Sequence, residues 1–170
     1  MAEIEIGIGK SGRQAYGFDD IAIVPSRRTR DPEDVDITWE IDAFKFGLPV
    51  MASAMDGVVS PRTAIAIGKL GGVGVLNLEG LWTRYENPDP LFEEISELDT
   101  DKATARMQQI YSEPIKPELI RDRIKELKAA GITSCASLTP QRTVQFAKTI
   151  IDSELEIFVI QGTVVIAEHV

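Results

Sequence analysis

Cysteine and histidine are scarce in this chain of 170 residues, which contains one of each. One cysteine cannot form a disulfide bond within the chain, and one cysteine with one histidine cannot complete a nitrogen and sulfur zinc site. Cys135 stands in a mostly small and apolar stretch, with no basic neighbour to lower the pKa of its thiol. We therefore expect Cys135 to be a small buried residue rather than a nucleophile. The sequence gives no basis for a catalytic role of His169 and predicts no metal site.

Basic side chains are also in the minority, with 18 Lys and Arg against 27 Asp and Glu and a formal charge of -9. This balance excludes a protein that binds nucleic acids non-specifically or attaches to an anionic membrane surface. The best apolar run, residues 157–167, contains Gln161 and falls well short of the ~20 residues of a membrane span. Glu3 and Glu5 interrupt the first apolar residues, which argues against a signal peptide. These absences predict a cytoplasmic protein with neither nucleic acid nor membrane as a partner.

Regular structure is expected from about residue 47 onward. Residues 1–46 are rich in Gly, Asp, Arg and Pro and contain only short apolar runs, so we expect an irregular N-terminal segment. A continuous apolar run, which is typical of a strand buried on both faces, follows at residues 48–52, and further strands are expected at residues 73–76, 132–138 and 155–160. Helical patterns separate these strands. Such an alternation predicts an α/β protein with a parallel sheet.

Caps and apolar spacing predict where the helices begin and which faces they bury. Ser60 and Thr139 are each followed by a proline, a pattern that favours a hydroxyl cap with proline in the first turn. Thr100 is expected to cap a further helix. Helical spacing predicts the inward faces of two helices. They are Ile120, Ile124 and Leu127, at i, i+4 and i+7, in the helix that begins at Pro117, and Val144, Ala147 and Ile151, at i, i+3 and i+7, in the helix that begins at Pro140.

The four expected strands are half the number in a (β/α)8 barrel, which typically needs ~250 residues. The fourth strand has no covering helix after it, which would leave one face of a small open sheet bare. We therefore interpret residues 47–170 as the first half of a (β/α)8 TIM barrel, truncated after the fourth strand. In parallel α/β sheets the functional residues lie on the loops that follow the strands. Those loops are residues 53–59, 77–80, 137–140 and 161–165.

A glycine motif near the N-terminus invites a phosphate-binding interpretation. Residues 7–12 read G-I-G-K-S-G and match G-x-G-x-x-G. The P-loop, however, requires a glycine where Ile4 stands, and the dinucleotide motif requires a helix after Gly12, where a turn is expected instead. We expect a flexible segment here rather than a phosphate site.

Three motifs in order resemble the IMP dehydrogenase/GMP reductase family. They are Y-G-F-D-D-I-A-I-V-P at residues 16–25, L-P-V-M-A-S-A-M-D-G-V-V at residues 48–59 and G-G-V-G-V-L-N at residues 71–77. The family usually inserts a pair of CBS domains after the second barrel strand and helix. The interval between the second and third expected strands is too short for them, so the chain resembles the short, IMP-dehydrogenase-related form without CBS domains.

The resemblance implies a barrel enzyme that oxidises IMP to XMP with NAD through a thioimidate on a loop cysteine. That cysteine would come from the other half of the barrel, because no G-x-G-S-x-C motif occurs here, and this chain alone is expected to be inactive. The resemblance places Ser53 and Met55 in the purine nucleotide pocket. It places Gln161, Gly162 and Thr163 at the nicotinamide cofactor, although the family usually has an aspartate at the position of Gln161.

Two alternatives stay open at this stage. GMP reductase shares the barrel and the nucleotide pocket but uses NADPH, so NADP is the alternative cofactor. The other alternative is a non-catalytic half-barrel that binds a nucleotide or a partner subunit and regulates it. The resemblance also implies a homo-oligomer, commonly a tetramer, for the full-length protein.

Overall fold

The computed structural model describes residues 3–13, 15–24 and 31–162, without the side chains of residues 3 and 18. The chain divides into two compact units, Met1–Asp36 and Ile37–Val170. The division therefore falls ten residues before the expected boundary at residue 46. Among the described residues, no helix is long and apolar enough to cross a membrane.

The first unit contains an antiparallel hairpin, so the N-terminal segment is not wholly irregular as expected. Strand β1 (Glu3–Gly7) pairs with β2 (Lys10–Arg13), and Gly9 in the turn has a φ of 69°. The glycine motif of residues 7–12 lies on this hairpin rather than between a strand and a helix. Isoleucines alternate along residues 4–8, and this period of two favours a strand. Two short 3-10 turns, η1 (Phe18–Asp20) and η2 (Pro32–Asp34), follow.

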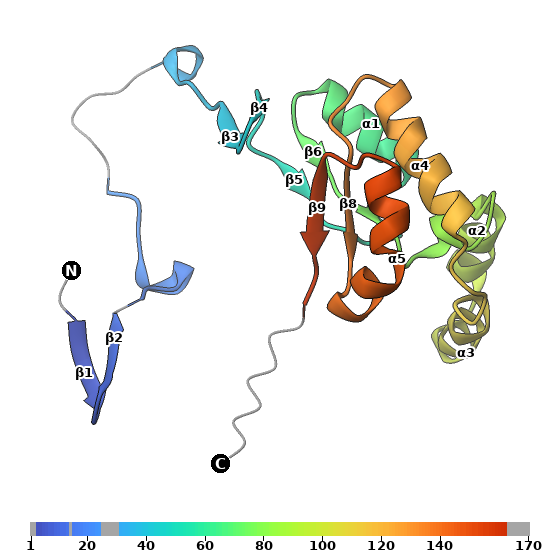
Figure 1. Ribbon diagram of the computed structural model, residues 1–170, viewed down its shortest axis with the longest axis horizontal. Coiled ribbons are helices and arrows are strands. Elements are labelled where there is room, and N and C mark those ends of the chain that lie inside the picture. The colour runs from blue at the N-terminus through green and yellow to red at the C-terminus, as the bar shows by residue number, and fades with distance from the viewer. Residues whose placement is uncertain (1–2, 14, 25–30, 163–170) are drawn as a thin grey trace. The chain divides into compact units, whose positions relative to one another are not determined.

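The second unit contains parallel strands in chain order, as the sequence predicted (Figure 1). Strand β5 (Met51–Ala52) pairs with β6 (Val73–Gly74), and β7 (Leu76–Asn77) pairs with β8 (Cys135–Leu138), which pairs with β9 (Ile157–Ile160). The expected strand at 73–76 is divided at Val75, because β6 pairs with β5 on one side and β7 pairs with β8 on the other.

Helices cover one face of these strands. Figure 1 shows α1 (Pro61–Lys69), α4 (Pro117–Ala129) and α5 (Pro140–Asp152) side by side against the sheet. The turn η3 (Leu81–Thr83) and the helices α2 (Asp89–Glu97) and α3 (Thr100–Ile110) occupy the interval between β7 and β8 that could not hold CBS domains. The core between helices and sheet contains Leu76, Ile124, Leu127, Leu138 and Phe146, among others.

A second hairpin lies on the opposite face of the sheet. Strand β3 (Trp39–Ile41) pairs with β4 (Phe44–Phe46), and both belong to residues expected to be irregular. Phe46 joins a core cluster with Val73, Val75 and Cys135, and Trp39 packs against it. The indole of Trp39 also donates a hydrogen bond of 2.7 Å to the Leu48 carbonyl. This packing explains why the hairpin belongs to the second unit.

Details of the helices confirm some expectations and correct others. The Ser60 hydroxyl caps α1 by accepting a 3.0 Å bond from Thr63 N, whereas Thr139 makes no side-chain cap bond and Asp99, not Thr100, precedes α3 as its cap. Ile120, Ile124 and Leu127 are fully buried, as expected.

The prediction of the inward face of α5 was wrong. Val144 and Ile151 are 84% and 73% exposed, whereas Phe146 and Ile150 are buried. Both sets have helical spacing, so they form two neighbouring apolar stripes on α5. Only the stripe with Phe146 contacts the core beneath the helices.

Candidate functional site

Four chain segments meet where the parallel strands end. The residues after β5, β7, β8 and β9 all leave the sheet at its carboxyl edge, because the strands run in the same direction. A cavity of about 250 Å³ opens there between β5 and β9. It is lined by Met51, Ser53, Ala54, Val75, Val159 and Gln161.

Two of the five predicted site residues share this cavity. Ser53 follows β5 and Gln161 follows β9, so residues more than a hundred positions apart line the same space. Met55 is 52% exposed and Gly162 is exposed, and neither lines the cavity. Thr163 lies outside the residues that the structure describes, as does His169.

Gln161 is held at the rim by the neighbouring strand. Its backbone N–H donates a 2.9 Å hydrogen bond to the Leu138 carbonyl, which extends the pairing of β9 with β8. The buried Ser137 hydroxyl donates a long bond of 3.4 Å to the Gln161 side-chain oxygen. Within the described residues the amide nitrogen of Gln161 makes no hydrogen bond, so it can donate to a ligand. The sequence placed Ser137 at the start of a loop, residues 137–140, whereas it lies within β8, where it pairs with Asn77 of β7 and Val159 of β9.

Asp56 connects three separate segments at this edge. Its Oδ2 accepts a 2.7 Å bond from Leu81 N, in η3, and a 2.6 Å bond from the Tyr111 hydroxyl, at the end of α3. Partial burial and then this bond to Asp56 raise the pKa of Tyr111 well above its usual value, so its hydroxyl remains protonated at neutral pH. The motif of residues 48–59 contains Asp56, but nothing in the sequence indicates that Tyr111 is its partner.

Arg84 and Glu79 continue the polar network over the ends of β7 and β8. The Nε of Arg84 donates a 3.1 Å bond to the Glu79 carbonyl, and its guanidinium lies 5.7 Å from the centre of the Tyr111 ring. Partial burial and then the nearby Arg142 lower the pKa of Arg84. The Glu79 carboxylate accepts a 2.5 Å bond from Thr139 N, where α5 begins, and lies 4.0 Å from Arg142.

Cys135 is fully buried, as the sequence predicted, and burial raises the pKa of its thiol to about 12. A thiol of that pKa carries almost no thiolate at neutral pH, and the thiolate is the nucleophile. In the described ranges, no group of three or more His, Cys, Asp or Glu side chains could hold a metal ion. The described residues of the site therefore offer hydrogen-bonding groups but no reactive thiol.

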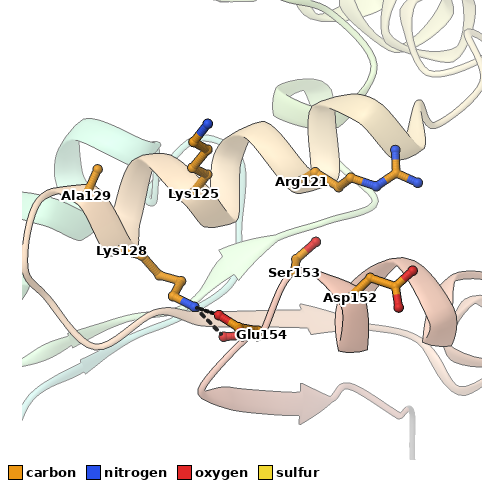
Figure 2. Close-up of a pocket in the computed structure, with 7 residues that line it drawn as sticks. All are labelled: Arg121, Lys125, Lys128, Ala129, Asp152, Ser153 and Glu154. Carbon is orange, nitrogen blue, oxygen red and sulfur yellow. Dashed lines mark hydrogen bonds and ion pairs between the residues drawn. The ribbon is translucent and has the colours of Figure 1, made fainter.

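A larger cavity, of about 510 Å³, lies at the other end of the strands (Figure 2). It is lined by Arg121, Lys125, Lys128, Ala129, Asp152, Ser153 and Glu154. The last turn of α4 and residues 152–154 lead into the amino ends of β8 and β9. Lys128 and Glu154 form a 2.8 Å ion pair across this cavity. Since conserved chemistry in such sheets sits at the carboxyl edge, we assign the site to the smaller cavity.

The arrangement defines an α/β protein with a polar site at the carboxyl edge of parallel strands. The family model described as the IMP dehydrogenase / GMP reductase domain matches residues 15–169. The chain belongs to this family, as the motifs of residues 16–77 indicated.

Known proteins similar to the chain agree with this assignment. Uncharacterized oxidoreductases of Mycolicibacterium smegmatis and Mycobacterium tuberculosis are each 37% identical over 98% of the chain. An IMP dehydrogenase/GMP reductase-like protein from Corynebacterium glutamicum has a crystal structure that matches 99% of the chain with a TM-score of 0.81 and 41% identity. Inosine-5'-monophosphate dehydrogenase of Methanocaldococcus jannaschii is 37% identical over 65 residues, which are 38% of the chain and 13% of that enzyme. The chain spans 46% of the length of the two oxidoreductases and of the solved structure.

Proposed function

We propose that the whole protein containing this chain is an NAD-dependent IMP dehydrogenase, in which residues 47–170 form the first half of a (β/α)8 barrel. The reaction converts IMP, NAD and water to XMP, NADH and a proton. The observation that carries this proposal is the cavity shared by Ser53 and Gln161 at the carboxyl edge of a family-typical sheet. Parallel strands that pair in chain order, with helices on one face, support the half-barrel.

The residues of the cavity suit a purine nucleotide. Ser53 is exposed at the rim, where its hydroxyl can donate to or accept from polar atoms of the base or ribose. Met55, two residues further on and outside the lining of the cavity, presents an exposed and flexible thioether that can pack against a flat base. The volume of about 250 Å³ lies just below the roughly 300–1,000 Å³ of sites that enclose a ligand. These groups bind and orient, which lowers the entropic cost of bringing the reactants together.

Gln161 is the residue through which this chain would hold NAD. Its amide nitrogen can donate to a ribose hydroxyl while its oxygen accepts from Ser137. An amide in place of the family's usual aspartate keeps the acceptor but removes the charge. NAD, when bound, accepts the hydride that leaves the purine ring.

The nucleophile of the reaction is not in this chain. Cys135 is its single cysteine, and its burial and a pKa of about 12 exclude it as a nucleophile at neutral pH. The covalent step through cysteine is therefore assigned to residues outside this chain, while residues 47–162 bind and orient the reactants.

The test uses the product of the whole reading frame that encodes residues 1–170. With IMP and NAD we expect IMP-dependent formation of NADH, followed by absorbance, and of XMP, followed by chromatography. Consumption of NADPH with GMP, and none of NAD with IMP, would assign the protein to GMP reductase instead. Absence of both reactions, together with absence of IMP binding by calorimetry, would contradict an enzyme of this family.

A further inference from the structure

The carboxylate of Asp56 joins the loop that carries Ser53 and Met55 to the end of α3. Tyr111 donates a 2.6 Å hydrogen bond to Asp56 Oδ2 across 55 positions of sequence, and Leu81 N donates a 2.7 Å bond to the same oxygen. One atom thus fixes three segments that are not neighbours in the chain. Hydrogen bonds to a charged acceptor are stronger than neutral ones, so this contact is a firm one.

Contacts from Arg84 and Tyr85 hold Tyr111 and the residue before it. Its ring lies 5.7 Å from the Arg84 guanidinium, and Arg84 also donates to the Glu113 carbonyl just beyond it. The Tyr85 hydroxyl donates a 2.9 Å bond to the carbonyl of Ile110, the last residue of α3. Ile110 is buried, while Tyr111 is 38% exposed. The end of α3 is therefore a fixed point rather than a loose surface turn.

The loop after β5 is short, and hydrogen bonds join its backbone groups to one another. A displacement of Asp56 therefore displaces the neighbouring residues of the loop. Met55 N donates to the Ser53 carbonyl at 2.8 Å, and Val59 N donates to the Met55 carbonyl at 2.8 Å. Val59 is fully buried and anchors the far end of the loop. Asp56 is the one residue of this loop whose side chain binds both η3 and the end of α3.

We propose that Tyr111 is a positioning residue of the nucleotide pocket, which acts by holding Asp56 and thereby the loop that presents Ser53 and Met55. The inference rests on the proposed function. Tyr111 touches no ligand in this role. Through this hydroxyl, the position of the end of α3 affects the affinity of the pocket for the nucleotide.

The test compares two tyrosines that both hold the end of α3. Tyr111→Phe removes the bond to Asp56 but keeps the ring beside Arg84, and Tyr85→Phe removes a bond of similar length to the Ile110 carbonyl. In the full-length product, Tyr111→Phe is expected to raise KM for IMP about five- to tenfold, the equivalent of one hydrogen bond, with kcat within about twofold. Tyr85→Phe leaves the bond from Tyr111 to Asp56 in place, so it is expected to change KM by less than about twofold.

Substitutions of Asp56 distinguish an effect on the position of the loop after β5 from a general effect on the stability of the protein. Asp56→Asn retains an oxygen that can accept from both Leu81 N and Tyr111, so it is expected to keep KM within about threefold of wild type. Asp56→Ala loses both bonds and should raise KM at least as much as Tyr111→Phe. Thermal melting of every variant reports how far each change affects folding.

The outcomes distinguish this inference from the proposed function. A wild-type protein without IMP-dependent turnover or IMP binding would contradict the proposed function. An active wild type whose KM does not change in Tyr111→Phe would overturn the inference alone. An equal rise of KM in Tyr85→Phe would also overturn it, since the effect would then belong to the packing of α3 as a whole.

Discussion

The carboxylate of Asp56 fills the place that a side chain at Gly80 would need. A Cβ at Gly80 would lie 1.7 Å from Asp56 Oδ1, which is buried and makes no hydrogen bond within the described residues. The glycine thus allows the close approach through which Asp56 Oδ2 reaches Leu81 N at 2.7 Å. The loop after β7 and the loop after β5 fit together at this contact.

Gly80→Ala is therefore expected to destabilise the protein by about 1–3 kcal/mol, because Asp56 must move and lose its bonds. The thermal midpoint of the full-length product measures this loss. Gly57→Ala, in the loop after β5 that contains Asp56, is the control, since a Cβ there would meet no atom within 4 Å. Equal melting temperatures for the two variants would contradict the close contact.

Ser53→Ala tests the nucleotide pocket directly. Ser53 lines the cavity with Gln161, so loss of its hydroxyl is expected to raise KM for IMP about three- to tenfold, the value of one hydrogen bond. Steady-state kinetics of the full-length product measure this change. Ser96→Ala is the control, because the exposed Ser96 hydroxyl on α2 bonds only the Glu93 carbonyl. An unchanged KM in Ser53→Ala would remove Ser53 from the pocket.

Glu79 is expected to stabilise the start of α5 rather than to act in catalysis. Its carboxylate accepts a 2.5 Å bond from the backbone N–H of Thr139, the residue that precedes α5. Glu79→Ala leaves this N–H without its acceptor and should cost about 1–3 kcal/mol. Glu79→Gln retains an acceptor oxygen and should cost less than half as much. Denaturant unfolding of both variants distinguishes these values, and equal losses would argue against the bond.

Burial of Cys135 makes the stability of the fold decline at alkaline pH. The pKa of its thiol rises from 9.0 to about 12 on folding, so the unfolded chain releases a proton above pH 9 that the folded chain retains. The contribution of the thiol is full below pH 9 and is lost as pH rises toward 12, at up to about 1.4 kcal/mol per pH unit. Unfolding measured between pH 8 and 10.5 should show a smaller decline in Cys135→Ala. Equal slopes would place the thiol in contact with solvent.

The two apolar stripes of α5 should respond differently to truncation. Phe146 is buried in the core beneath the helices, so Phe146→Ala is expected to cost about 3–5 kcal/mol. Val144 is 84% exposed, and Val144→Ala should change stability by no more than about 0.5 kcal/mol. Thermal melting of the two variants provides the comparison. A large loss in Val144→Ala would show that this stripe is covered in the full-length protein.

The sequence predicted the order of strands and helices because their signals are local. Apolar runs placed β8 and β9 within a few residues, and the spacing of Ile120, Ile124 and Leu127 identified the buried face of α4. The apolar spacing did not identify the buried face of α5, because two apolar stripes on this helix share the same spacing. They failed for β3 and β4, whose short strands are stabilised by the packing of Trp39 and Phe46 on the sheet.

Only the tertiary structure decided which polar residues meet. The family resemblance predicted Ser53 and Gln161 separately, and the sheet brings them to the same cavity because parallel strands end at one edge. Asp56 and Tyr111 are 55 positions apart, and no periodicity or motif relates them. Their hydrogen bond exists because α3 ends above the loop that follows β5, a relationship that depends on how the helices pack and not on any local preference of the chain.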